Sequence, residues 1–390
     1  MRAAIDGSGA PVRSILQARG FSLIELMVAL TLGLIVTGGV IATFVSVHSA
    51  SKDTAGVAEL ADNGRIALDI LEQTLRSAGY MACNSTLRQA VSTGLSPTPL
   101  TGDFTEALAG YEATPGGSGT GPGSAVALVA KPPGDSSAGD WATSSGLGNA
   151  LDSSVLSDAA ALPISGSDVI AAHTTYSQVT PVYTNAQSGA NSVTVLSTTG
   201  LSAGELGIVS NCASSVVDEI QSVAGGTVTF DQPLGQTFGS GSQVAVADTI
   251  VFYVGTGSDG DGALYSYSLA GTASFQKPAE VVPDIENMQI LYGVDTGGSL
   301  AATEYVTADQ VPAAAAANPD CQAIPGTGAV DFNCVVSVKL ALLVASPLNA
   351  APPPKSAQTF NLLGTAVTAP IDTRIRRVFE TTVSLRDTTD

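Results

Sequence analysis

Basic residues are scarce in this chain of 390 residues. Lys and Arg total 15 against 34 Asp and Glu, which gives a formal net charge of −19. A balance this negative disfavours nucleic acid as a partner, because the phosphate backbone would repel the protein. No basic stretch with interleaved aromatic residues occurs either. We therefore expect no nucleic-acid partner.

Histidine and the familiar catalytic motifs are equally scarce. No G-x-S-x-G, H-E-x-x-H or P-loop pattern is present, and the two histidines, His48 and His173, stand far apart in the sequence. Two isolated histidines indicate neither a catalytic triad nor a metal cluster. We interpret His48 as a residue at a membrane interface and His173 as a structural residue of a strand. We expect a protein that is not an enzyme and has no resident cofactor.

Cysteine is sparse too, with only Cys83, Cys212, Cys321 and Cys334. No C-x-x-C pair occurs, which argues against a zinc site. Charged residues make up 13% of the chain, and Gly, Ser, Thr and Ala are abundant, as in exported proteins. Four cysteines in an exported chain indicate two disulfides, with three possible pairings. We favour a local Cys321–Cys334 bridge, which leaves Cys83 to pair with Cys212; free buried thiols remain an alternative.

The chain does have one long apolar run, residues 21–47, which carries a single charge, Glu25. At about 1.5 Å per residue a helix of this length spans roughly 40 Å, enough to cross a bilayer. Residues 1–20 hold three arginines and one aspartate, a flank typical of the cytoplasmic side. An ordinary secretory signal is cleaved after its apolar core. Here the small residue Gly20 precedes the run, so cleavage after it would leave the helix on the mature protein.

The junction Arg19-Gly20 followed by Phe-Ser-Leu-Ile-Glu-Leu resembles the class III signal of type IV prepilins. The resemblance implies that a prepilin peptidase cleaves after Gly20 and that the new terminal residue, Phe21, is N-methylated. Glu25 then becomes the fifth residue of the mature chain. The 20-residue leader is longer than many of its kind, which leaves a start codon further downstream as an alternative.

Glu25 needs a partner, because an unpaired carboxylate in hydrocarbon costs several kcal/mol. The partner we expect is the amine that cleavage leaves on Phe21 of a neighbouring subunit. Their pairing would neutralise both charges and set the axial offset between subunits, which makes Glu25 an assembly contact. The alternative is an acid near the membrane interface that snorkels or is protonated.

Beyond the apolar run, apolar and small residues recur at steps of three and four, which predicts one face of a helix. These residues are Val57, Leu60, Gly64, Ala67, Leu71, Leu75 and Ala78. We expect one helix from residue 21 to about residue 79, with Gly79 as its C-cap. Its transmembrane part covers residues 21–47, and its amphipathic part, residues 48–83, is expected to pack on a β-rich head.

The rest of the chain divides by composition. We expect residues 84–167 to form a variable Gly/Ser/Pro-rich insertion in which only 125–130 is strand-like. We predict that residues 168–248 form an antiparallel β subdomain and that residues 249–390 form a C-terminal antiparallel sheet. Three strands of that sheet alternate apolar and polar residues, which predicts one buried face. The expected fold class is α+β and pilin-like: a long N-terminal helix packed on an antiparallel sheet head with an inserted β subdomain.

Four segments of the last third resemble the strand series of PilW-type minor pilins: DTIVFYV, VPDIENMQILYGVD, VVSVKLALLVAS and RIRRVFETTVSLRD. So does the order of a helix ending in SAGYMAC and a later GIVSNCASSVV. The resemblance implies a minor pilin that takes part in type IV pilus assembly and initiation, at or near the tip. Its implied partners are prepilin peptidase, other minor pilins, the major pilin and the inner membrane. The head would lie in the periplasm before assembly and on the extracellular pilus (fimbrium) afterwards.

Two other functions stay open. A minor pseudopilin of a type II secretion system shares the signal, the helix and the β head. A pilus-borne adhesin or ligand-binding module would use residues 84–248 to bind a surface, and the length of the chain motivates this alternative.

Two small clusters of charge complete the candidate sites. Asp259 and Asp261 lie in a Gly-rich turn, where closely spaced acids can bind Ca²⁺. Hairpin turns commonly use Asp-Gly, and the later Glu of an EF-hand is missing, so we expect a turn and keep Ca²⁺ as the weaker alternative. Arg374, Arg376 and Arg377 form a basic cluster that we expect to balance acids on neighbouring strands or subunits.

Overall fold

The computed structural model describes residues 22–83, 91–93, 104, 106–115, 119–136, 140–142, 156, 161–184, 188–211, 213–268, 277–318, 321 and 332–385. The expected cleavage site at Gly20 and Phe21 lies outside these residues, and so does Cys212. The chain divides into two compact units, Met1–Lys52 and Asp53–Asp390.

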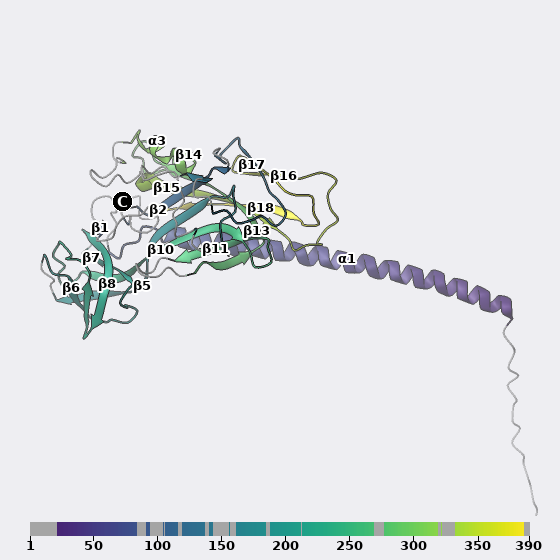
Figure 1. The fold of residues 1–390 in the computed structure, drawn as a ribbon, viewed down its shortest axis with the longest axis horizontal. Helices are drawn as coiled ribbons and strands as arrows, with labels where there is room; N and C mark the ends of the chain where they lie inside the picture. The colour runs from purple at the N-terminus through teal and green to yellow at the C-terminus, as the bar shows by residue number, and fades with distance from the viewer. Residues whose placement is uncertain are drawn as a thin grey trace, which may run out of the picture. The chain divides into compact units, whose positions relative to one another are not determined.

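Helix α1 (Leu23–Arg76) begins in the first unit and ends in the second (Figure 1). Its apolar residues in the first unit are exposed, and a Cβ added at Gly33, Gly38 or Gly39 would meet no atom within 4 Å. Among the described residues, α1 is the one helix long and apolar enough to cross a membrane. A helix whose apolar surface has no partner within its own chain needs lipid or other helices to cover it.

The part of α1 in the second unit buries one stripe, as the sequence predicted. The buried residues are Gly56, Leu60, Gly64, Ala67, Leu71 and Leu75. The helix ends at Arg76, before the expected C-cap. Gly79 adopts φ +82° and donates its N–H to the carbonyl of His173 at 2.8 Å. This glycine therefore turns the chain out of the helix and ties it to a strand.

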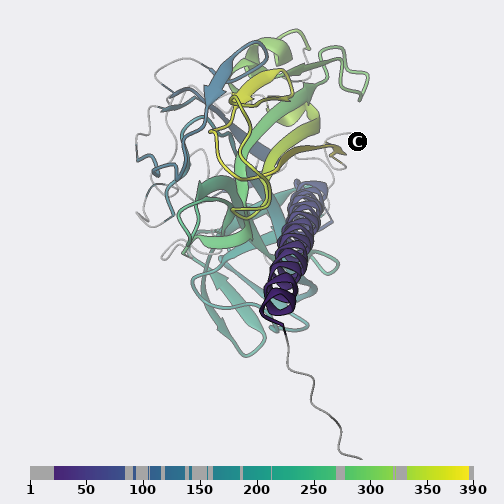
Figure 2. The ribbon, with the colours of Figure 1, turned by 90° about the vertical axis from the view of Figure 1, so that its right-hand side faces the viewer.

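This stripe of α1 covers a four-stranded antiparallel sheet in the order β14-β13-β15-β18 (Figure 2). The strands are β13 (Ile285–Val294), β14 (Glu304–Val306), β15 (Val335–Ala345) and β18 (Arg376–Ser384). Gly64 lies against the ring of Phe379, and Gly56 lies against Ala350. The hydroxyl of Thr381 donates to Glu72 at 2.5 Å. The expected packing of the helix on the C-terminal sheet is therefore confirmed.

A three-stranded layer covers part of the other face of this sheet. Its strands are β3 (Ala125–Ala127), β16 (Thr359–Leu362) and β17 (Thr365–Thr368). Val126, Leu362 and Val367 share a hydrophobic cluster with Ala341 and Leu343 of β15. As a result β15 is buried almost throughout, and β13, which contacts β10 and β11, is buried almost throughout as well. The expectation of one buried face is wrong for these two strands, because alternation along a strand does not show whether a second layer will cover its other face.

The largest sheet is organised by two long antiparallel strands, β5 (Val169–Thr184) and β10 (Gln243–Thr256). Four further strands extend the pair on its two sides: β2 (Leu108–Ala113), β4 (Trp141–Ala142), β11 (Gly262–Ser268) and β12 (Ala279–Pro283). All six residues of β2 are buried. The expectation that only 125–130 is strand-like within 84–167 is therefore wrong, because β2 contains Gly and Glu and so lacks the apolar run that marks a strand.

The same two long strands close a ring with four others. These are β6 (Ser192–Val195), β7 (Leu206–Ser210), β8 (Ser215–Ala224) and β9 (Thr227–Phe230), with β1 (Val91–Thr93) added in parallel to β8. Thirteen buried apolar residues, among them Phe230 and Phe238, fill the ring. Closure leaves each of these six strands paired on both sides, which removes open sheet edges. Because β10 runs from 243 to 256, it crosses the boundary that we expect at residue 248.

Three short helical segments lie near β13 and β15: η3 (Ala308–Gln310), α3 (Val311–Ala315) and η5 (Phe332–Cys334). Pro312 stands in the first turn of α3, where its missing N–H costs nothing. Val311, Ala315 and Phe332 join the main hydrophobic core. These segments therefore extend the core beyond the end of the sheet.

Candidate functional sites

The N-terminal site begins where the described residues begin. The N–H of Leu26 donates to the carbonyl of Ser22 at 3.1 Å, so helical hydrogen bonding starts directly after the expected cleavage position. Glu25 lies in the first turn of α1 and is exposed. A carboxylate there is favoured by the partial positive charge of the helix N-terminus. Among the described residues Glu25 has no ion-pair partner.

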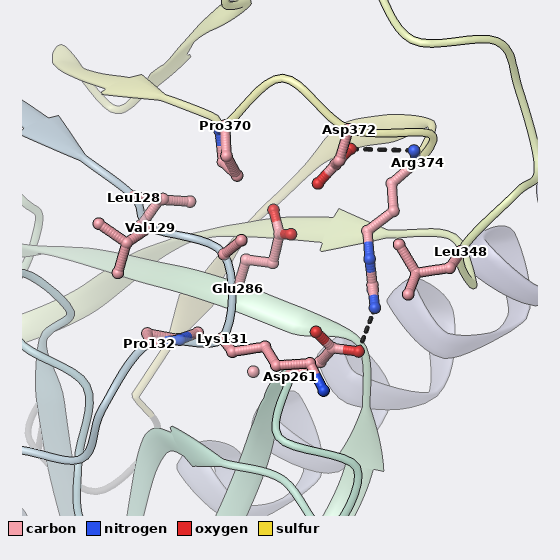
Figure 3. A pocket seen from close by; sticks show the side chains of 12 residues that line it. Leu128, Val129, Lys131, Pro132, Asp261, Glu286, Leu348, Pro370, Asp372 and Arg374 are labelled. Atoms are coloured by element: carbon pink, nitrogen blue, oxygen red, sulfur yellow. Dashed lines mark hydrogen bonds and ion pairs between the residues drawn. The ribbon is translucent and has the colours of Figure 1, made fainter.

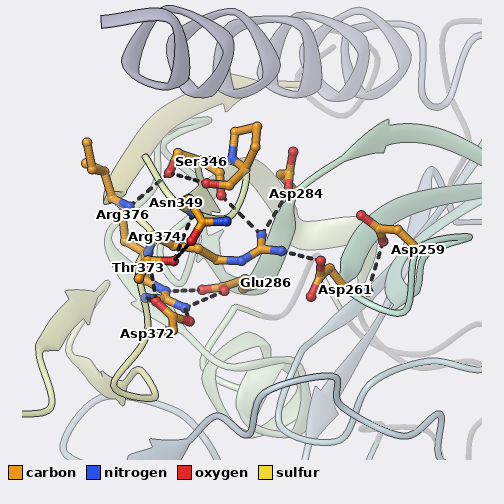
Figure 4. A network of polar contacts seen from close by, with 12 residues as sticks. Asp259, Asp261, Asp284, Glu286, Ser346, Asn349, Asp372, Thr373, Arg374 and Arg376 are labelled. Carbon is orange, nitrogen blue, oxygen red and sulfur yellow. Dashed lines mark hydrogen bonds and ion pairs between the residues drawn. The ribbon is translucent and has the colours of Figure 1, made fainter. Parts of the chain in front are cut away.

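Arg374, just before β18, joins three separate segments of the head (Figure 4). Its Nη1 donates to Asp284 Oδ1 at 2.9 Å and to the carbonyl of Ser346 at 3.2 Å, and its Nη2 forms an ion pair with Asp261. The side chain of Arg374 is only 4% exposed. Burial raises the pKa of Asp284, and the Arg374 contact offsets part of that rise.

Arg376, the first residue of β18, holds two more acids. Its Nε and Nη2 donate to the two carboxylate oxygens of Glu286 at 2.6 and 2.9 Å, a bidentate arrangement. Its Nη1 and Nη2 donate to Asp372 at 2.8 and 2.5 Å. Although burial opposes ionisation, hydrogen bonds from Arg376 and from the N–H of Arg374 hold the pKa of Asp372 below its ordinary value. The expectation that these arginines balance acids on neighbouring strands is confirmed for Arg374 and Arg376, whereas Arg377 is exposed.

The contacts of the 259–261 turn bear on the calcium alternative. Asp259 Oδ1 accepts the N–H of Asp261 at 2.9 Å, which closes the turn locally. The Asp261 carboxylate forms an ion pair with Arg374. A cation at this point would have to displace or face a buried guanidinium. The arrangement therefore favours a hairpin turn, between β10 and β11, over a metal site.

A small hollow lies beside this network (Figure 3). It has a volume of about 90 Å³, and its floor contains Asp261, Glu286, Asp372 and Arg374. Leu128, Val129, Pro132, Leu348 and Pro370 form apolar walls. Ligand pockets usually measure about 300–1,000 Å³, and the acids on this floor already bind arginine. The network is thus best explained as a clamp that holds the head together.

The cysteines lie at two places in the head. Cys321 and Cys334 form a disulfide with a Cα–Cα distance of 5.5 Å, the local pairing that the sequence favours. Cys83 is also disulfide-bonded, and its Sγ lies 3.6 Å from the hydroxyl oxygen of Ser210. The chain after α1 is thereby brought against the end of β7, close in sequence to Cys212, which is not among the described residues.

Sequence reasoning missed a buried acid that joins two sheets. Asp168 is 2% exposed; its Oδ1 accepts the N–H of Ala113 at 2.9 Å and its Oδ2 accepts the N–H of Ile290 at 2.8 Å. The residue therefore links β2 to β13. Its only sequence signal is a polar residue directly before the apolar strand that begins at Val169, and this signal is shared by many strand starts.

Two family models match this chain. Residues 251–387 match the type IV pilus-assembly protein W family, and residues 16–41 match the prokaryotic N-terminal methylation motif. The C-terminal sheet region belongs to the PilW family. The first match covers β11 to β18 and the last residues of β10, together with both clamping arginines. The second covers Gly20, Phe21 and Glu25, and a prepilin methylation motif implies processing by prepilin peptidase. The match to a pilus-assembly family implies pilin partners.

Comparison with solved structures adds little to this result. A tailspike of Acinetobacter baumannii bacteriophage AP22, solved with a capsular saccharide, is 15% identical with a TM-score of 0.17; the match covers 20% of this chain and only 15% of the tailspike. A type IV-like pilin from Thermus thermophilus is 16% identical with a TM-score of 0.21, over 48% of this chain and 86% of that one. Scores this low support no argument about fold or function. No curated protein sequence matches the chain.

Proposed function

We propose that this chain is a minor pilin that is incorporated into a type IV pilus at or near its tip and takes part in initiating assembly. In this proposal prepilin peptidase cleaves after Gly20, Phe21 is N-methylated, and α1 holds the protein in the inner membrane with its head in the periplasm. Assembly with other minor pilins and the major pilin then moves it to the extracellular pilus. Its role is structural and not enzymatic.

One observation supports this proposal above the others: a methylation motif overlaps the start of an apolar helix that is exposed in the described part of the first unit. The residues of α1 in the first unit are exposed throughout the described part. The methylation motif covers residues 16–41, and thus the start of that same helix. A lone membrane anchor would need the apolar surface only. An acid at Glu25 next to a newly formed N-terminal amine supports a helix that also packs against other helices.

The position within the filament follows from where Glu25 can find its partner. A carboxylate that pairs with the terminal amine of a neighbour requires a subunit whose N-terminus lies within reach. The topmost subunit has no such neighbour above it. Glu25 therefore favours a position close to the tip over the topmost position itself.

Mass spectrometry of purified pili tests the proposal. We expect peptides of this chain that begin at N-methylated Phe21, together with chemical crosslinks to other pilins. The stoichiometry should be low relative to the major pilin. Absence of the chain from pili, combined with crosslinks to type II secretion components, would contradict the proposal and support the pseudopilin alternative.

A further inference from the structure

Two further acids of the head are buried, and their surroundings differ from the clamp at Arg374 and Arg376. Glu112 of β2 is 1% exposed, and Asp168 is 2% exposed. Among the described residues neither of these acids forms an ion pair. Burial of a carboxylate without a counter-charge favours its neutral, protonated form. The two acids therefore need a proton unless hydrogen bonds from neutral groups satisfy every oxygen.

The hydrogen bonds of these acids leave one oxygen without a donor. The two oxygens of Asp168 accept backbone N–H groups, one from Ala113 and one from Ile290. Glu112 Oε1 accepts the N–H of Thr120 at 3.0 Å. Glu112 Oε2 is buried and has no hydrogen-bond partner among the described residues. A negative charge shared by that oxygen would be poorly satisfied, so the geometry favours a proton on Glu112.

The hydroxyl of Thr120 lies between the two acids. Its oxygen is 2.9 Å from Glu112 Oε1 and 3.3 Å from Asp168 Oδ1, so these two carboxylate oxygens are separated by no more than the sum of the two distances. A hydroxyl has one hydrogen, which points to only one of the two oxygens at a time. If both acids were ionised, the two charges would repel each other across this single donor. One proton held between the acids removes that repulsion.

Thr120 also ties the acid pair to the three-stranded layer of β3, β16 and β17. Its carbonyl accepts the hydroxyl of Thr365 in β17. Further along the same loop, which spans residues 119–124, the N–H of Gly123 donates to the carbonyl of Gly364 at 3.0 Å. The chain then enters β3, which pairs in parallel with β17. The 119–124 loop therefore connects the two acids to the edge of this layer.

We propose that a proton held between Glu112 and Asp168 is a latch, which keeps the 119–124 loop closed and whose loss opens this loop and frees the adjoining edge of the three-stranded layer. Ionisation of both acids would place two charges in a buried site, so water must enter or the loop must move away. Three of the six residues of the loop are glycine, which allows its backbone to rearrange more readily than β2. The loop also lines a cavity of about 490 Å³, which leaves room for its displacement.

The charges around the pair favour the protonated, closed loop. Burial, and then the charge of Asp168, raise the pKa of Glu112 to about 9, and burial raises the pKa of Asp168 to about 7. Asp309 of η3 raises both pKa values further, and burial together with the two acids raises the pKa of Tyr292 on β13. In an open loop both carboxyl groups would have ordinary pKa values of about 4. The closed loop therefore holds protons that the open loop releases, so opening becomes easier as pH rises from 5 through 9.

Hydrogen–deuterium exchange of the full chain in detergent tests the latch. The N–H groups of Thr120, Gly123 and Ser124 are hydrogen-bonded in the closed loop, so their exchange, corrected for the intrinsic rate at each pH, reports its opening. Between pH 7 and 9 opening releases one proton, which shifts the opening equilibrium about tenfold per pH unit. We expect protection of these groups to fall about a hundredfold over that range. Protection of β15 should stay higher throughout, because the loop opens locally.

Two variants and one spectrum decide the outcome. Glu112→Gln keeps the shape of the protonated side chain and cannot ionise, so its loop should keep the same protection, within about twofold, from pH 7 to 9. Glu304→Gln removes an exposed acid on β14 and should keep the wild-type pH response. If Glu112→Gln does not fold, infrared spectroscopy of the wild-type chain still tests the latch: the carbonyl stretch of a protonated carboxyl group should be present at pH 8 and absent at pH 10. The proposal is overturned by absence of this band at pH 8, by pH-independent exchange of the wild-type loop, by equal protection of the loop and β15, or by a wild-type response in Glu112→Gln.

Discussion

The buried acids of the head lie in two different electrostatic environments. Arg374 and Arg376 each bring two acids together in the part of the molecule next to α1 and β18. Glu112 and Asp168 lie near each other, and among the described residues neither forms an ion pair with a basic side chain. A buried ion pair need not stabilise a protein relative to an apolar core, but removing one partner leaves a costly unpaired charge. The arginines should therefore be sensitive positions, and the effect should depend on pH.

Arg374→Leu tests this sensitivity. We expect a loss of about 3 kcal/mol in the free energy of unfolding at pH 7, because Asp284 stays buried without its guanidinium partner. Burial already raises the pKa of Asp284, and the variant loses the contact that opposes this rise. The folded variant then binds a proton more readily than the unfolded chain, so its stability deficit should shrink as pH falls from 7 toward 4.

The matched control for this substitution is Arg377→Leu. Arg377 is the next residue on β18 and is exposed, so its replacement should change stability by less than about 0.5 kcal/mol. Denaturant unfolding of the full chain in detergent, followed by the fluorescence of Trp141, measures both variants. Equal stability of the two variants at pH 7 would contradict the clamp.

The sequence alone could indicate the arginine cluster but not its partners. Asp261, Asp284 and Glu286 stand about 90 to 113 residues before the arginines that bind them. The register of β13, β15 and β18 brings Asp284 and Glu286 to the arginines, and the turn between β10 and β11 supplies Asp261. By contrast, the Cys321–Cys334 bridge closes a short loop, and sequence spacing was enough to favour it. Glu112 left no signal, because a glutamate within LAGYEA is typical of a surface strand.

Two glycines allow α1 to approach the C-terminal sheet and the loop that follows β15 closely. A Cβ at Gly56 would lie 2.7 Å from the Cβ of Ala350, and a Cβ at Gly64 would lie 2.6 Å from the ring of Phe379. A glycine within a helix costs up to about 1 kcal/mol relative to alanine. Here that cost is offset by contact with the sheet, so at these positions the glycines serve packing more than flexibility.

Gly56→Ala should therefore destabilise the head in spite of its better helix propensity. Overpacking costs about 1–3 kcal/mol and exceeds the propensity gain, so we expect a net loss of about 1 kcal/mol. The contact at Gly56 is with a Cβ, which has little freedom to move away. Thermal unfolding of the detergent-solubilised chain measures the change.

Gly38→Ala serves as the comparison, because a Cβ there would meet nothing within 4 Å. This second variant should leave the unfolding of the head unchanged. If Gly56→Ala is as stable as the wild type or more so, the contact between α1 and the loop after β15 is not as tight as the structure indicates.

At the scale of elements, local patterns in the sequence predict the helix, its buried stripe and most strands. They do not predict that β5 and β10 are long enough to belong to two sets of partners. Closure of the ring depends on pairings between β5 and β6 and between β7 and β10, whose positions are set by the turns between them. Periodicity reports which residues face a core, but it does not report which strand lies on either side.

At the scale of the whole molecule, the N-terminal motif couples processing to assembly in the proposed function. Cleavage after Gly20 would create an amine at Phe21, and Glu25 of a neighbour would then have a partner for its charge. The order of events matters, because the unprocessed chain offers no such amine at this position. Two substitutions can therefore separate the steps.

Gly20→Val should leave the leader attached, so that the protein inserts into the membrane, lacks N-methylated Phe21 and is absent from pili. Glu25→Ala should be inserted, cleaved and methylated, yet its incorporation should fall strongly, because the neighbouring amine loses its counter-charge in hydrocarbon. Mass spectrometry of membrane and pilus fractions measures both steps in cells that assemble the filament. Glu25→Asp, which keeps the charge on a shorter side chain, should recover part of the incorporation. Glu25→Ala present in pili at the wild-type level would show that Glu25 is only a tolerated acid near the membrane interface.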